Sequence, residues 1–505
     1  MEDLLSRLKN PILSRIIDLL PSGLPIFLVG GAVRDALLGR QDYDLDFVTA
    51  GDALKLARKL ADELGGAYFP LDSVRNVARI IVRSELGGEP AKIQPYKIDI
   101  SRYQGPDLHS DLFGRDFTIN AMALPLSQPE TLVDPLHGAD DLIAKRLRAC
   151  SPTSFLDDPI RILRAVRLAI DLDLNIQPET LGWLRLAIPR LVDISAERLR
   201  DELFRMLSLA HPSSALRVLD MFGVLEQLLP EVSVLKGVQQ SPPHVMDVWN
   251  HTMDSLNRLE ILLELLAPAF DPEKASNLTL GMVALILGRY REQLQLHLDS
   301  ALNPERPHRA LLFLAGLYHD VGKSATQSTD ETGQIRFLGH DQAGSQLAER
   351  RGQALKLSNL EISRLATIVG HHMRPSFLSH PEEPPTRKAI YHFFKATGAA
   401  GVDICILSLA DVLATYGPTL PPDRWARHLE VVRSLLQAWW EDKHEKVLPP
   451  ALVTGDDLQT ALGLTPSPLI GYLLESIREA QVSGEVHNRE EAIQLAGDIQ
   501  KSQAK

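Results

Sequence analysis

The sequence predicts an α+β fold in which a mixed-sheet head is followed by an all-α neck, body and tail. Between about residues 25 and 135, short apolar runs that suit strands mix with stretches of helical composition. Beyond about residue 150, apolar residues recur with the 3.6-residue period of a helix, interrupted by proline-containing breaks. A chain of 505 residues is too long for one hydrophobic core, so we expect three or four compact units.

The expected elements follow from the same patterns, taken in chain order. The head should contain a short amphipathic helix and a proline-rich turn within 1–24, strands at 26–29, around 43–47, and near 78–82 and 97–100, and helices at 32–38 and 52–64. The helical half should be broken by loops at 267–277, 303–308 and 380–387, and a Pro-Pro break at 447–450 should set off a helical tail.

The composition is that of an ordinary protein of aqueous compartments, with 45% hydrophobic and 23% charged residues. Cys150 and Cys405 are far apart and lack a Cys/His metal spacing, which favours a reducing cytoplasm over a disulfide framework. Residues 1–6 lack the features of a signal peptide. The most apolar stretch, Leu278 to Gly288, is too short to span a membrane. We therefore expect a cytoplasmic protein that does not contact membranes.

The net charge of −12 argues against a protein that coats nucleic acid over its whole surface. Phosphate contacts depend on nearby charge, however, and one segment is locally basic. It has two acidic residues, Asp157 and Asp158, against six basic ones: Lys145, Arg146, Arg148, Arg161, Arg164 and Arg167.

The first chemically informative stretch runs from Phe27 to Val48. Its strand is followed by Gly30-Gly31, a turn without Cβ atoms, and by a helix that Gly39 ends. The turn offers backbone N–H groups, and Arg34 offers a cation, to the phosphates of a substrate.

In the next strand, Asp44 and Asp46 are two residues apart and so point to the same face. Two carboxylates on one face repel each other unless a cation lies between them. Mg²⁺ suits such a pair, because it prefers oxygen ligands and often shares its site with substrate phosphates. A glycine turn alone, or two aspartates on an exposed strand face alone, would be ordinary structural features. The glycine turn followed by the Asp-x-Asp strand predicts a site for a metal ion and phosphates.

A second cluster lies between Asp111 and Ala123. Arg115 and Asp116 precede an apolar run that carries Asn120. An arginine can pair with phosphate and an aspartate can accept a hydrogen bond from a ribose hydroxyl, although such a pair is commonly a surface ion pair. The following turn, Asp134 to Leu142, is expected to be structural.

A third cluster runs from Asp157 to Arg167. It could be a capped helix with Pro159 in the first turn and solvated arginines. Alternatively, Asp158 and Arg161, three apart on a helix, could pair with the Watson–Crick edge of cytosine or adenine. Both bases present an amine donor beside a ring-nitrogen acceptor, whereas uracil and guanine do not. Arg164 and Arg167 continue the stripe and could reach a triphosphate.

These three clusters together resemble the class II, bacterial-type tRNA nucleotidyltransferases, the CCA-adding enzymes and the related poly(A) polymerases. The resemblance rests on Gly-Gly-Ala-Val-Arg-Asp with Asp-x-Asp, on Gly-Arg-Asp-Phe-Thr-Ile-Asn-Ala, and on Asp-Asp-Pro-x-Arg-x-x-Arg-Ala-x-Arg. A further match, Glu197 to Leu203, is similar to a helical motif of the family's neck. The motifs occur in the family's order over about residues 25–205.

The resemblance implies a role for each matching residue. Asp44 and Asp46 would hold the catalytic Mg²⁺ ions, and Gly31 and Arg34 would meet the nucleotide phosphates. Arg115 and Asp116 would serve phosphate and ribose. Asp158 and Arg161 would read the incoming base, and Arg164 and Arg167 would assist the triphosphate. The partners implied are the tRNA 3′ end, CTP and ATP, with no obligatory protein partner.

Three departures from the family pattern bear on the activity. Asp157 stands where many members have Glu, and Gly114 replaces the first of two arginines. More important, Ile98 to Tyr103 runs into Asp111 without the long flexible loop of full CCA-adding members. A short segment there is typical of CC-adding relatives that work with a separate A-adding enzyme. We expect CCA addition, with CC addition as the alternative. Poly(A) polymerase is less favoured, because Asp72 to Arg79 lacks the Arg-Arg-Phe-type segment.

The second half carries a set of imidazoles and carboxylates in helical contexts. Lone histidines are commonly structural, but six such positions suit a divalent-metal site, in particular a transition metal. The set resembles the His-Asp (HD) phosphohydrolase domain over about 245–415. The implied ligands are His251, His319, Asp320, His340, His372 and Asp411. His372 fits better than its neighbour His371. The second divalent site suggests a function of another class, a metal-dependent phosphohydrolase acting on RNA ends or nucleotides.

The expected domains are therefore a nucleotidyltransferase head at 1–148, a helical neck with the base-reading and RNA-binding motifs at 149–240, an HD body at 241–445 and a helical tail at 446–505. A third possibility is a non-enzymatic RNA-binding protein with an inactive head.

Overall fold

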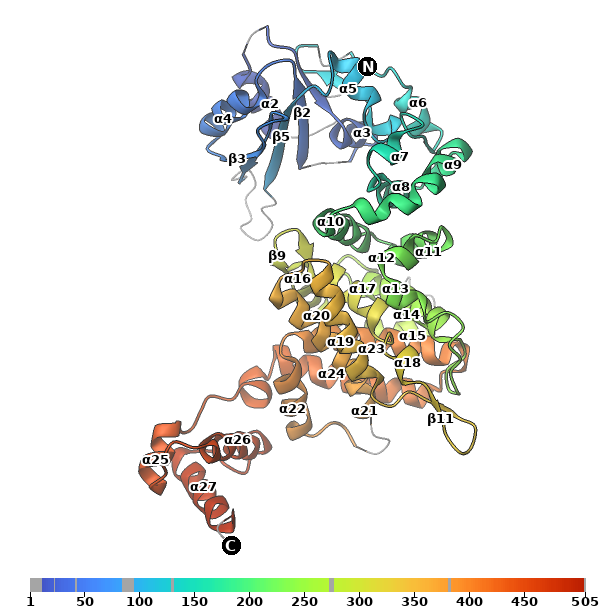
Figure 1. The fold of residues 1–505 in the computed structure, drawn as a ribbon. Coiled ribbons are helices and arrows are strands. Elements are labelled where there is room, and N and C mark those ends of the chain that lie inside the picture. The colour runs from blue at the N-terminus through green and yellow to red at the C-terminus, as the bar shows by residue number, and fades with distance from the viewer. Residues whose placement is uncertain are drawn as a thin grey trace. The chain divides into compact units, whose positions relative to one another are not determined.

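The computed structural model describes residues 11–21, 23–40, 43–83, 95–128, 131–271, 277–379 and 383–503. The chain forms two compact units, Met1–Ile194 and Ser195–Lys505 (Figure 1). Of the expected elements, residues 1–10 of the first helix and parts of the loops at 267–277 and 380–387 lie outside the described residues. The α+β class is confirmed.

The first unit is built on a mixed six-stranded sheet with the order β3-β4-β5-β2-β1-β6. β2 and β5 are parallel, and the other neighbours are antiparallel. The strands predicted from sequence are confirmed, whereas β3 and β6 were not predicted. The bounds are β1 Ile26–Val29, β2 Asp44–Thr49, β3 Ala67–Asp72, β4 Val77–Val82, β5 Tyr96–Arg102 and β6 Ala123–Pro125.

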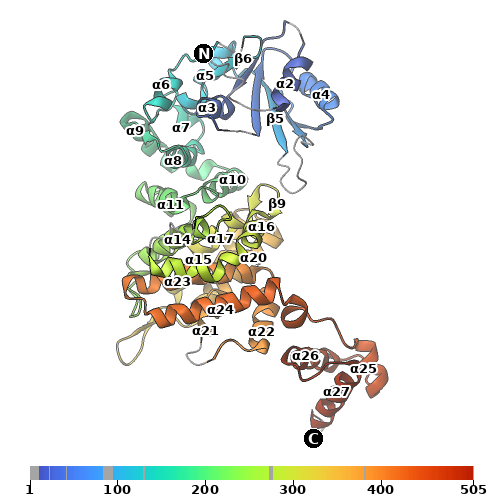
Figure 2. The ribbon, with the colours of Figure 1, turned by 180° about the vertical axis from the view of Figure 1, so that it is seen from behind.

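One face of the sheet is covered by α2 (Pro11–Leu19) and α4 (Ala53–Leu64), as Figures 1 and 2 show from opposite sides. The Asp52 side chain accepts a hydrogen bond from the Lys55 N–H and so caps α4, and Gly65 ends the helix with a φ of 65°. The apolar side chains of α2 and α4 form one buried core with the strands. The predicted helix at 52–64 is thus confirmed.

The other face of β1 and β2 carries a small core of Val29, Val48, Leu112, Ala121 and Ala123, to which α5 (Leu108–Phe113) and β6 contribute. The helix α3 (Gly31–Leu37), by contrast, places Ala32, Val33 and Ala36 in the larger core with α2 and α4. The 3₁₀ turn η1 (Thr118–Asn120) and α6 (Gly138–Ile143) contact α3, so they bring the second sequence cluster close to the first.

The rest of the first unit is helical apart from a short parallel pair, β7 (Arg146–Leu147) with β8 (Asn175–Ile176). Its helices are α7 (Ser154–Asp157), α8 (Arg161–Asp171), α9 (Pro178–Ala187) and η2 (Ile188–Asp193).

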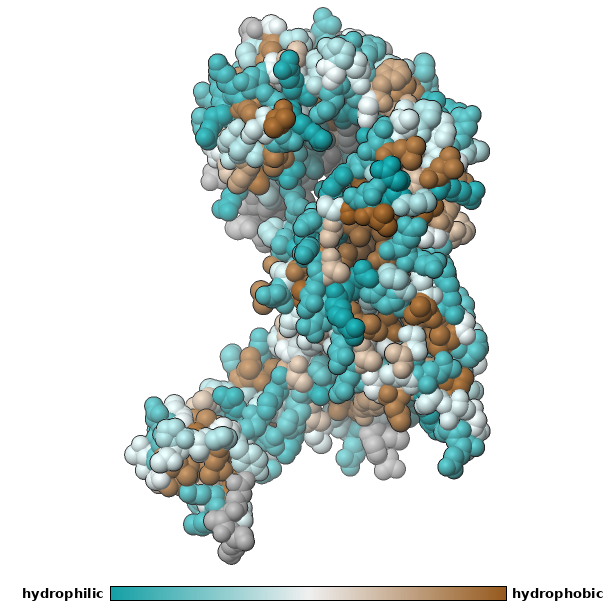
Figure 3. Space-filling model, in the orientation of Figure 1, coloured by the Kyte–Doolittle hydropathy of each residue, from teal (hydrophilic) through white to brown (hydrophobic). Residues whose placement is uncertain are grey.

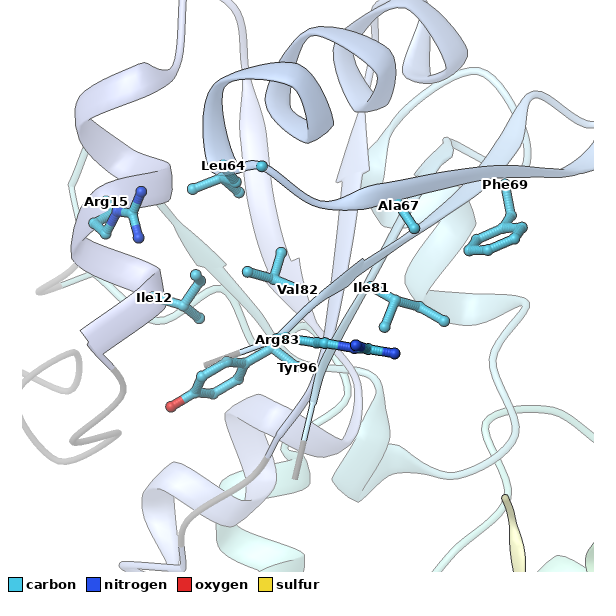
Figure 4. A pocket seen from close by; sticks show the side chains of 10 residues that line it. Ile12, Arg15, Leu64, Ala67, Phe69, Ile81, Val82, Arg83 and Tyr96 are labelled. Carbon is cyan, nitrogen blue, oxygen red and sulfur yellow. The ribbon is translucent and has the colours of Figure 1, made fainter. Parts of the chain in front are cut away.

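A pocket of about 760 Å³ opens in the head between α2, the end of α4 and the strands β3 to β5 (Figure 4). Among the residues that the structure describes, the lining includes Arg15, Arg83, Phe69 and Tyr96 and contains no carboxylate that could serve as a metal ligand of the catalytic site.

The second unit is helical apart from two short hairpins, as far as the structure describes it. One of them, β9 (Ala301–Asn303) with β10 (Arg306–Pro307), overlaps the expected loop at 303–308, and the other is β11 (Ser328–Thr329) with β12 (Ile335–Arg336). Its main helices are α10 (Ala196–Leu207), α11 (Pro212–Met221), α14 (Val248–Leu265), α15 (Leu278–Leu287), α16 (Arg291–Asp299), α17 (His308–Tyr318), α19 (His340–Ala354), α20 (Asn359–His371), α22 (Arg387–Thr397), α23 (Ala400–Tyr416) and α24 (Pro422–Trp440).

The helix α23 is the centre of this body. The segment Ala400–Thr419, which contains α23, is the one segment among the described residues that is long and apolar enough to cross a membrane, but it is 78% buried inside the protein. It packs against α14, α20 and α24, so its apolar character is that of a core helix.

The last three helices have a core of their own. α25 (Gly455–Leu462), α26 (Pro468–Ser483) and α27 (Arg489–Gln503) bury Leu458, Leu473, Ile477, Ala492 and Ala496 among themselves. On the face drawn in Figure 3, hydrophobic residues occur in separate patches divided by hydrophilic ones.

Candidate functional site

The glycine turn of the head packs directly against the second aspartate of β2. Asp46 lies opposite Val29 in the antiparallel register, and Gly30 follows with a φ of 75°. A Cβ atom at Gly30 would lie 3.1 Å from Asp46 Oδ2 and 3.4 Å from Arg115 Nη1. A glycine is needed here both for its positive φ and for this close approach. The turn, one carboxylate and the arginine of the second cluster therefore meet at one point.

The two aspartates of β2 share a face of the strand. Asp44 is exposed, Asp46 is half-buried, and Leu45 between them is fully buried on the other side. Their carboxylate oxygens are suitable ligands for a hard divalent cation. On the adjacent strand, Asp99 is the register partner of Asp46, and it binds Arg79 through two hydrogen bonds of 2.8 Å.

The arginine of the glycine motif is held by two partners. Arg34 Nε and Nη2 donate to Asp35 at 2.9 and 2.7 Å, and Nη1 donates to Asn120 Oδ1 at 2.7 Å. Gly31 is the first residue of the same helix, α3. The first cluster is thus joined to the second through Asn120.

Asp116 is buried and accepts hydrogen bonds at both of its carboxylate oxygens. Arg164 donates to its Oδ2 from Nε at 2.9 Å and from Nη2 at 2.6 Å, and Oδ1 accepts from Asn120 Nδ2 and the Phe117 N–H. Burial alone would raise the pKa of this carboxyl, but Arg164 and the hydrogen bonds lower it to about 2. Asp116 is therefore an ionised acceptor at any physiological pH.

The third cluster differs from its expected geometry. Asp158 has extended backbone angles (φ −148°, ψ 95°) between α7 and α8, so the expectation that Asp158 and Arg161 lie on one helix is wrong. Pro159 favours this, because the residue before a proline avoids the helical region.

Arg161 is instead held by groups outside its own helix. It donates to Ser154 Oγ at 2.8 Å, to the Gly114 carbonyl at 2.8 Å and to the Arg115 carbonyl at 3.2 Å. Arg164 and Arg167 follow on α8, both half-buried. Through Arg161 and Arg164, α8 is bound to the second cluster at three successive residues, 114 to 116.

The second unit brings all six expected metal ligands together around Asp320. Its Oδ2 lies 3.5 Å from His251 Nε2 and 3.3 Å from His319 Nε2, and its Oδ1 lies 3.5 Å from His340 Nε2 and 3.9 Å from His372 Nε2. Asp411 Oδ1 closes the set at 3.0 Å from His251 Nε2. Asp320 thus belongs to two triads that could each hold a metal ion.

Three of the histidines are oriented by backbone carbonyls. The Nδ1 atoms of His319, His340 and His372 lie 2.7, 2.8 and 2.7 Å from the carbonyls of Gly316, Phe337 and Val369. Because a carbonyl only accepts, each Nδ1 must carry the proton, which leaves Nε2 as a ligand atom. The neighbouring His371 lines a different pocket.

The electrostatics of the body site suit a cation. Burial raises the pKa of Asp320, but Lys323 and His319 outweigh it and hold the pKa well below its usual range. Burial lowers the pKa of His372 to about 4, so this ring is neutral and able to ligate. A pocket of about 520 Å³ opens beside the cluster, lined by residues that include Lys323, Phe337 and Phe377.

Sequence reasoning missed three residues of these sites. Lys323 donates to Asp320 at 2.7 Å and to Gln240 at 2.6 Å, and His244 stacks edge-on against His251. Lys323 follows the His-Asp pair closely in sequence, which could have drawn attention to it, whereas no pattern marks His244. Asn120 was noted in its motif but was given no role.

Four family models match: "Poly A polymerase head domain" over residues 26–148, "Probable RNA and SrmB- binding site of polymerase A" over 173–235, "HD domain" over 280–416, and a tRNA nucleotidyltransferase domain 2 over 433–496. His251 lies outside the matched HD range, although it contacts Asp320.

Several curated relatives match over nearly the whole chain. The CC-adding tRNA nucleotidyltransferase of Geobacter sulfurreducens is 33% identical, over 97% of this chain and 95% of the relative. The A-adding tRNA nucleotidyltransferase of Deinococcus radiodurans is 32% identical, over 92% of this chain and 93% of the relative. Among solved structures, the Thermotoga maritima CCA-adding enzyme in complex with tRNA has the same fold, with a TM-score of 0.56 and 21% identity over 99% of both chains. This chain therefore belongs to the family of tRNA nucleotidyltransferases that carry an HD domain.

Proposed function

We propose that this protein adds CCA to the 3′ end of tRNA without a template, using CTP and ATP. The observation that carries the proposal is the meeting of Gly30, Asp46 and Arg115, which joins a phosphate-binding turn, a metal ligand and a cation. The relatives named above support nucleotidyl transfer to tRNA ends. The protein acts in the cytoplasm and needs no partner protein.

The metal ligands of the head are Asp44 and Asp46, and the ion is Mg²⁺. When bound, Mg²⁺ stabilises the attacking 3′ oxygen of the tRNA and the leaving pyrophosphate oxygen. The protein's own part is to hold the nucleotide in line. Gly31 and Arg34 bind its phosphates at the start of α3, and Arg115 adds a cation beside Asp46.

The remaining residues orient the sugar and the base. Asp116, ionised because Arg164 lies against it, accepts a hydrogen bond from the ribose. Asp158 accepts from the exocyclic amine of cytosine or adenine, and Arg161 donates to the ring nitrogen. Arg161 is already fixed by carbonyls, so it loses little conformational freedom when a nucleotide binds. Arg164 and Arg167 face the triphosphate.

A second candidate, addition of CC only, is favoured by the segment between β5 and α5. Only residues 103–107 join these elements. The segment is tied down, because the Gln104 N–H donates to Asp111 Oδ1 at 2.8 Å and Asp107 caps α5. A segment this short and fixed leaves little freedom for the site to change from one that accepts CTP to one that accepts ATP. The Geobacter relative, which matches over 97% of this chain, is CC-adding.

The experiment that separates these candidates offers labelled CTP and ATP to two tRNA substrates. One lacks all three terminal nucleotides and the other lacks only the final A. A complete CCA supports the first candidate, and extension that stops after CC supports the second. Addition of A alone to the second substrate rejects both. No incorporation into either substrate rejects nucleotidyl transfer.

For the second unit we propose a metal-dependent phosphohydrolase that acts on RNA ends or nucleotides. The supporting observation is the open pocket beside the buried cluster, since a purely structural metal site would be closed. Mixed imidazole and carboxylate ligands suit a divalent transition-metal ion. Release of phosphate from nucleoside monophosphates with Mn²⁺ or Co²⁺, lost in Asp320→Ala, is the expected result; no release with any divalent ion rejects it.

We also propose the domain division into a head at 1–148, a neck at 149–240, a body at 241–445 and a tail at 446–505. The neck and body would bind tRNA by shape and backbone contacts, as expected for structured RNA. An RNA-binding protein without catalysis would show tight tRNA binding but no nucleotide turnover in the same assay.

A further inference from the structure

The side chain of Asn120 joins two oppositely charged side chains that belong to different elements. Its Oδ1 accepts from Arg34 Nη1 at 2.7 Å, and its Nδ2 donates to Asp116 Oδ1 at 3.1 Å. An amide is suited to this position, because it has an acceptor at one end and a donor at the other. Asn120 is 5% exposed, so neither bond is readily exchanged for one with water.

The two bonds extend into a longer chain of contacts. Arg34 is paired with Asp35 on α3, and Asp116 is paired with Arg164 on α8. Asn120 is therefore the link between the helix that follows the glycine turn and the helix that follows Asp158. In this series of contacts, every charged residue except Asp35 has a proposed contact with the nucleotide, whereas Asn120 has none.

The backbone that carries Asn120 is clamped from the opposite side. Thr118 Oγ1 donates to Asp141 Oδ2 at 2.7 Å, and Asp141 also accepts from Arg148 Nε at 2.7 Å. A Cβ atom at Gly138 would lie 2.1 Å from the Thr118 carbonyl, so α6 packs backbone to backbone against η1. The amide of Asn120 thus projects from a fixed point.

From these contacts we propose that Asn120 is a positioning residue for nucleotidyl transfer, which orients Arg34 toward the phosphates and Asp116 toward the ribose. The proposal rests on the proposed function of the head. Asn120 acts through its two neighbours and does not touch the substrate itself. Its loss should therefore impair use of the nucleotide more than binding of tRNA.

The test compares Asn120→Asp with Asn120→Ala. When protonated, the introduced carboxyl can accept from Arg34 and donate to Asp116, as the amide does. When ionised, it cannot donate, and it repels Asp116. Burial and the adjacent carboxylate raise the pKa of the introduced group, while Arg34 lowers it. The other titratable or charged groups around this position act through its neighbours: Asp35 pairs with Arg34, Arg164 pairs with Asp116, the Cys150 thiol interacts with Asp116, and Asp141 binds Thr118. The pKa of Cys150 is raised to about 12 by burial, so its thiol stays neutral.

The measurement is kcat/KM for CTP between pH 5.5 and 8.5. At pH 8, Asn120→Asp should fall at least about tenfold below wild type, since it loses a hydrogen bond to a charged group. It should recover toward pH 5.5, so that its profile crosses that of Asn120→Ala, whose deficit is constant. The KM for tRNA should change by less than about twofold in both variants.

The matched control is Asn76→Asp. Asn76 also lies in the head, and its Nδ2 also donates to a carboxylate, Asp52 Oδ1, at 3.4 Å, but it is not part of the site. This control should follow the wild-type pH profile.

Wild-type activity in Asn120→Ala, or parallel profiles for the two variants, would overturn the proposal. If Asn120→Asp does not fold, Asn120→Ala decides alone. A loss confined to CTP use supports positioning, whereas an equal loss of tRNA binding and of thermal stability overturns it. Wild-type protein that incorporates no CTP rejects the proposed function and the inference together, while an active wild type with unaffected variants rejects the inference alone.

Discussion

Arg364 and Asp403 form an ion pair inside the helical body, between α20 and α23. The two side chains are 9% and 0% exposed, and His297 Nε2 lies 3.3 Å from the same carboxylate. Each partner precedes a proposed metal ligand by two helical turns, Arg364 before His372 and Asp403 before Asp411. The pair therefore joins the two helices about two turns away from their proposed metal ligands.

Asp403→Asn should destabilise the body by about 3 kcal/mol, because it leaves a buried guanidinium without its counter-charge. Burial raises the pKa of Asp403, but Arg364 and His297 outweigh it and the pKa is lowered. The stabilisation is therefore present above the unfolded-state pKa of about 3.9 and is lost as pH falls below it. Urea unfolding between pH 3 and 6 measures this.

The control for Asp403→Asn is Glu430→Gln on α24, which removes a more exposed pair with Arg433 and should cost less than about 1 kcal/mol. Equal unfolding midpoints for the two variants would show that the buried pair contributes no more stability than the exposed pair.

Asp44→Asn and Asp46→Asn should each lower CTP incorporation into tRNA by at least about a thousandfold, since each removes a ligand of the ion that stabilises the transition state. Asp62→Asn, on the exposed side of α4, should retain wild-type rates. The assay is initial-rate incorporation at saturating Mg²⁺, with tRNA binding measured in parallel. Incorporation that survives in both β2 variants would reject the assignment of the metal ligands.

Arg164→Gln should create a new acidic limb in the pH–rate profile. The pKa of Asp116 is about 2 because Arg164 offsets the effect of burial. Without Arg164, burial dominates and the pKa rises, so that the carboxylate is protonated, and activity lost, as pH falls from about 6 to 4. Wild type should show no such limb from Asp116 in this range. A variant profile that is merely lower at every pH would contradict this role of Arg164.

The two adjacent histidines of the body should behave differently. His372→Ala should weaken binding of Mn²⁺ or Co²⁺ by about tenfold or more, as measured by isothermal titration calorimetry, whereas His371→Ala should not. His372 lies in the cluster around Asp320 and His371 lines another pocket. Both variants should incorporate CTP into tRNA at wild-type rates. Similar metal affinities for the two variants would contradict the assignment.

Glu475 and Glu479 of α26 should hold the tail against α22. Lys388 and His392 contact Glu479, and Lys395 contacts Glu475, all at partly exposed positions. Such pairs are screened by salt, so the double reversal of Glu475→Lys and Glu479→Lys should expose the link at 447–452 to proteases, as should 1 M NaCl for wild type. The tail should stay folded, because its core is its own. If residues 447–452 resist proteases equally well in the variant and in wild type, these ion pairs do not hold the tail against α22.

The sequence predicted those features that depend on local spacing. The alternation around Leu45 placed Asp44 and Asp46 on one face, and β1 begins and ends at the predicted residues. Contacts with backbone carbonyls carry no such signal. Arg161 binds carbonyls 46 and 47 residues away, and nothing in its own motif indicates this.

Local pattern also failed where two influences competed. Asp158 has the spacing of a helical partner for Arg161, yet Pro159 keeps it extended. The strand β6 is only three residues long, too short for a periodic signal, and it is defined by pairing with β1. The local sequence of α23 also does not show that it is a core helix, because its burial depends on packing against α14 and α20, which are far away in sequence.

The backbone carbonyls of Gly316, Phe337 and Val369 have a consequence for the strength of metal binding. They hold three imidazole rings of the body in one orientation before any ion arrives. Binding therefore costs little rotational entropy in these side chains, and almost the whole ligand-field and electrostatic gain appears as affinity. A site organised in this way should retain its ion through dialysis, and the protein as purified should carry metal in its second unit.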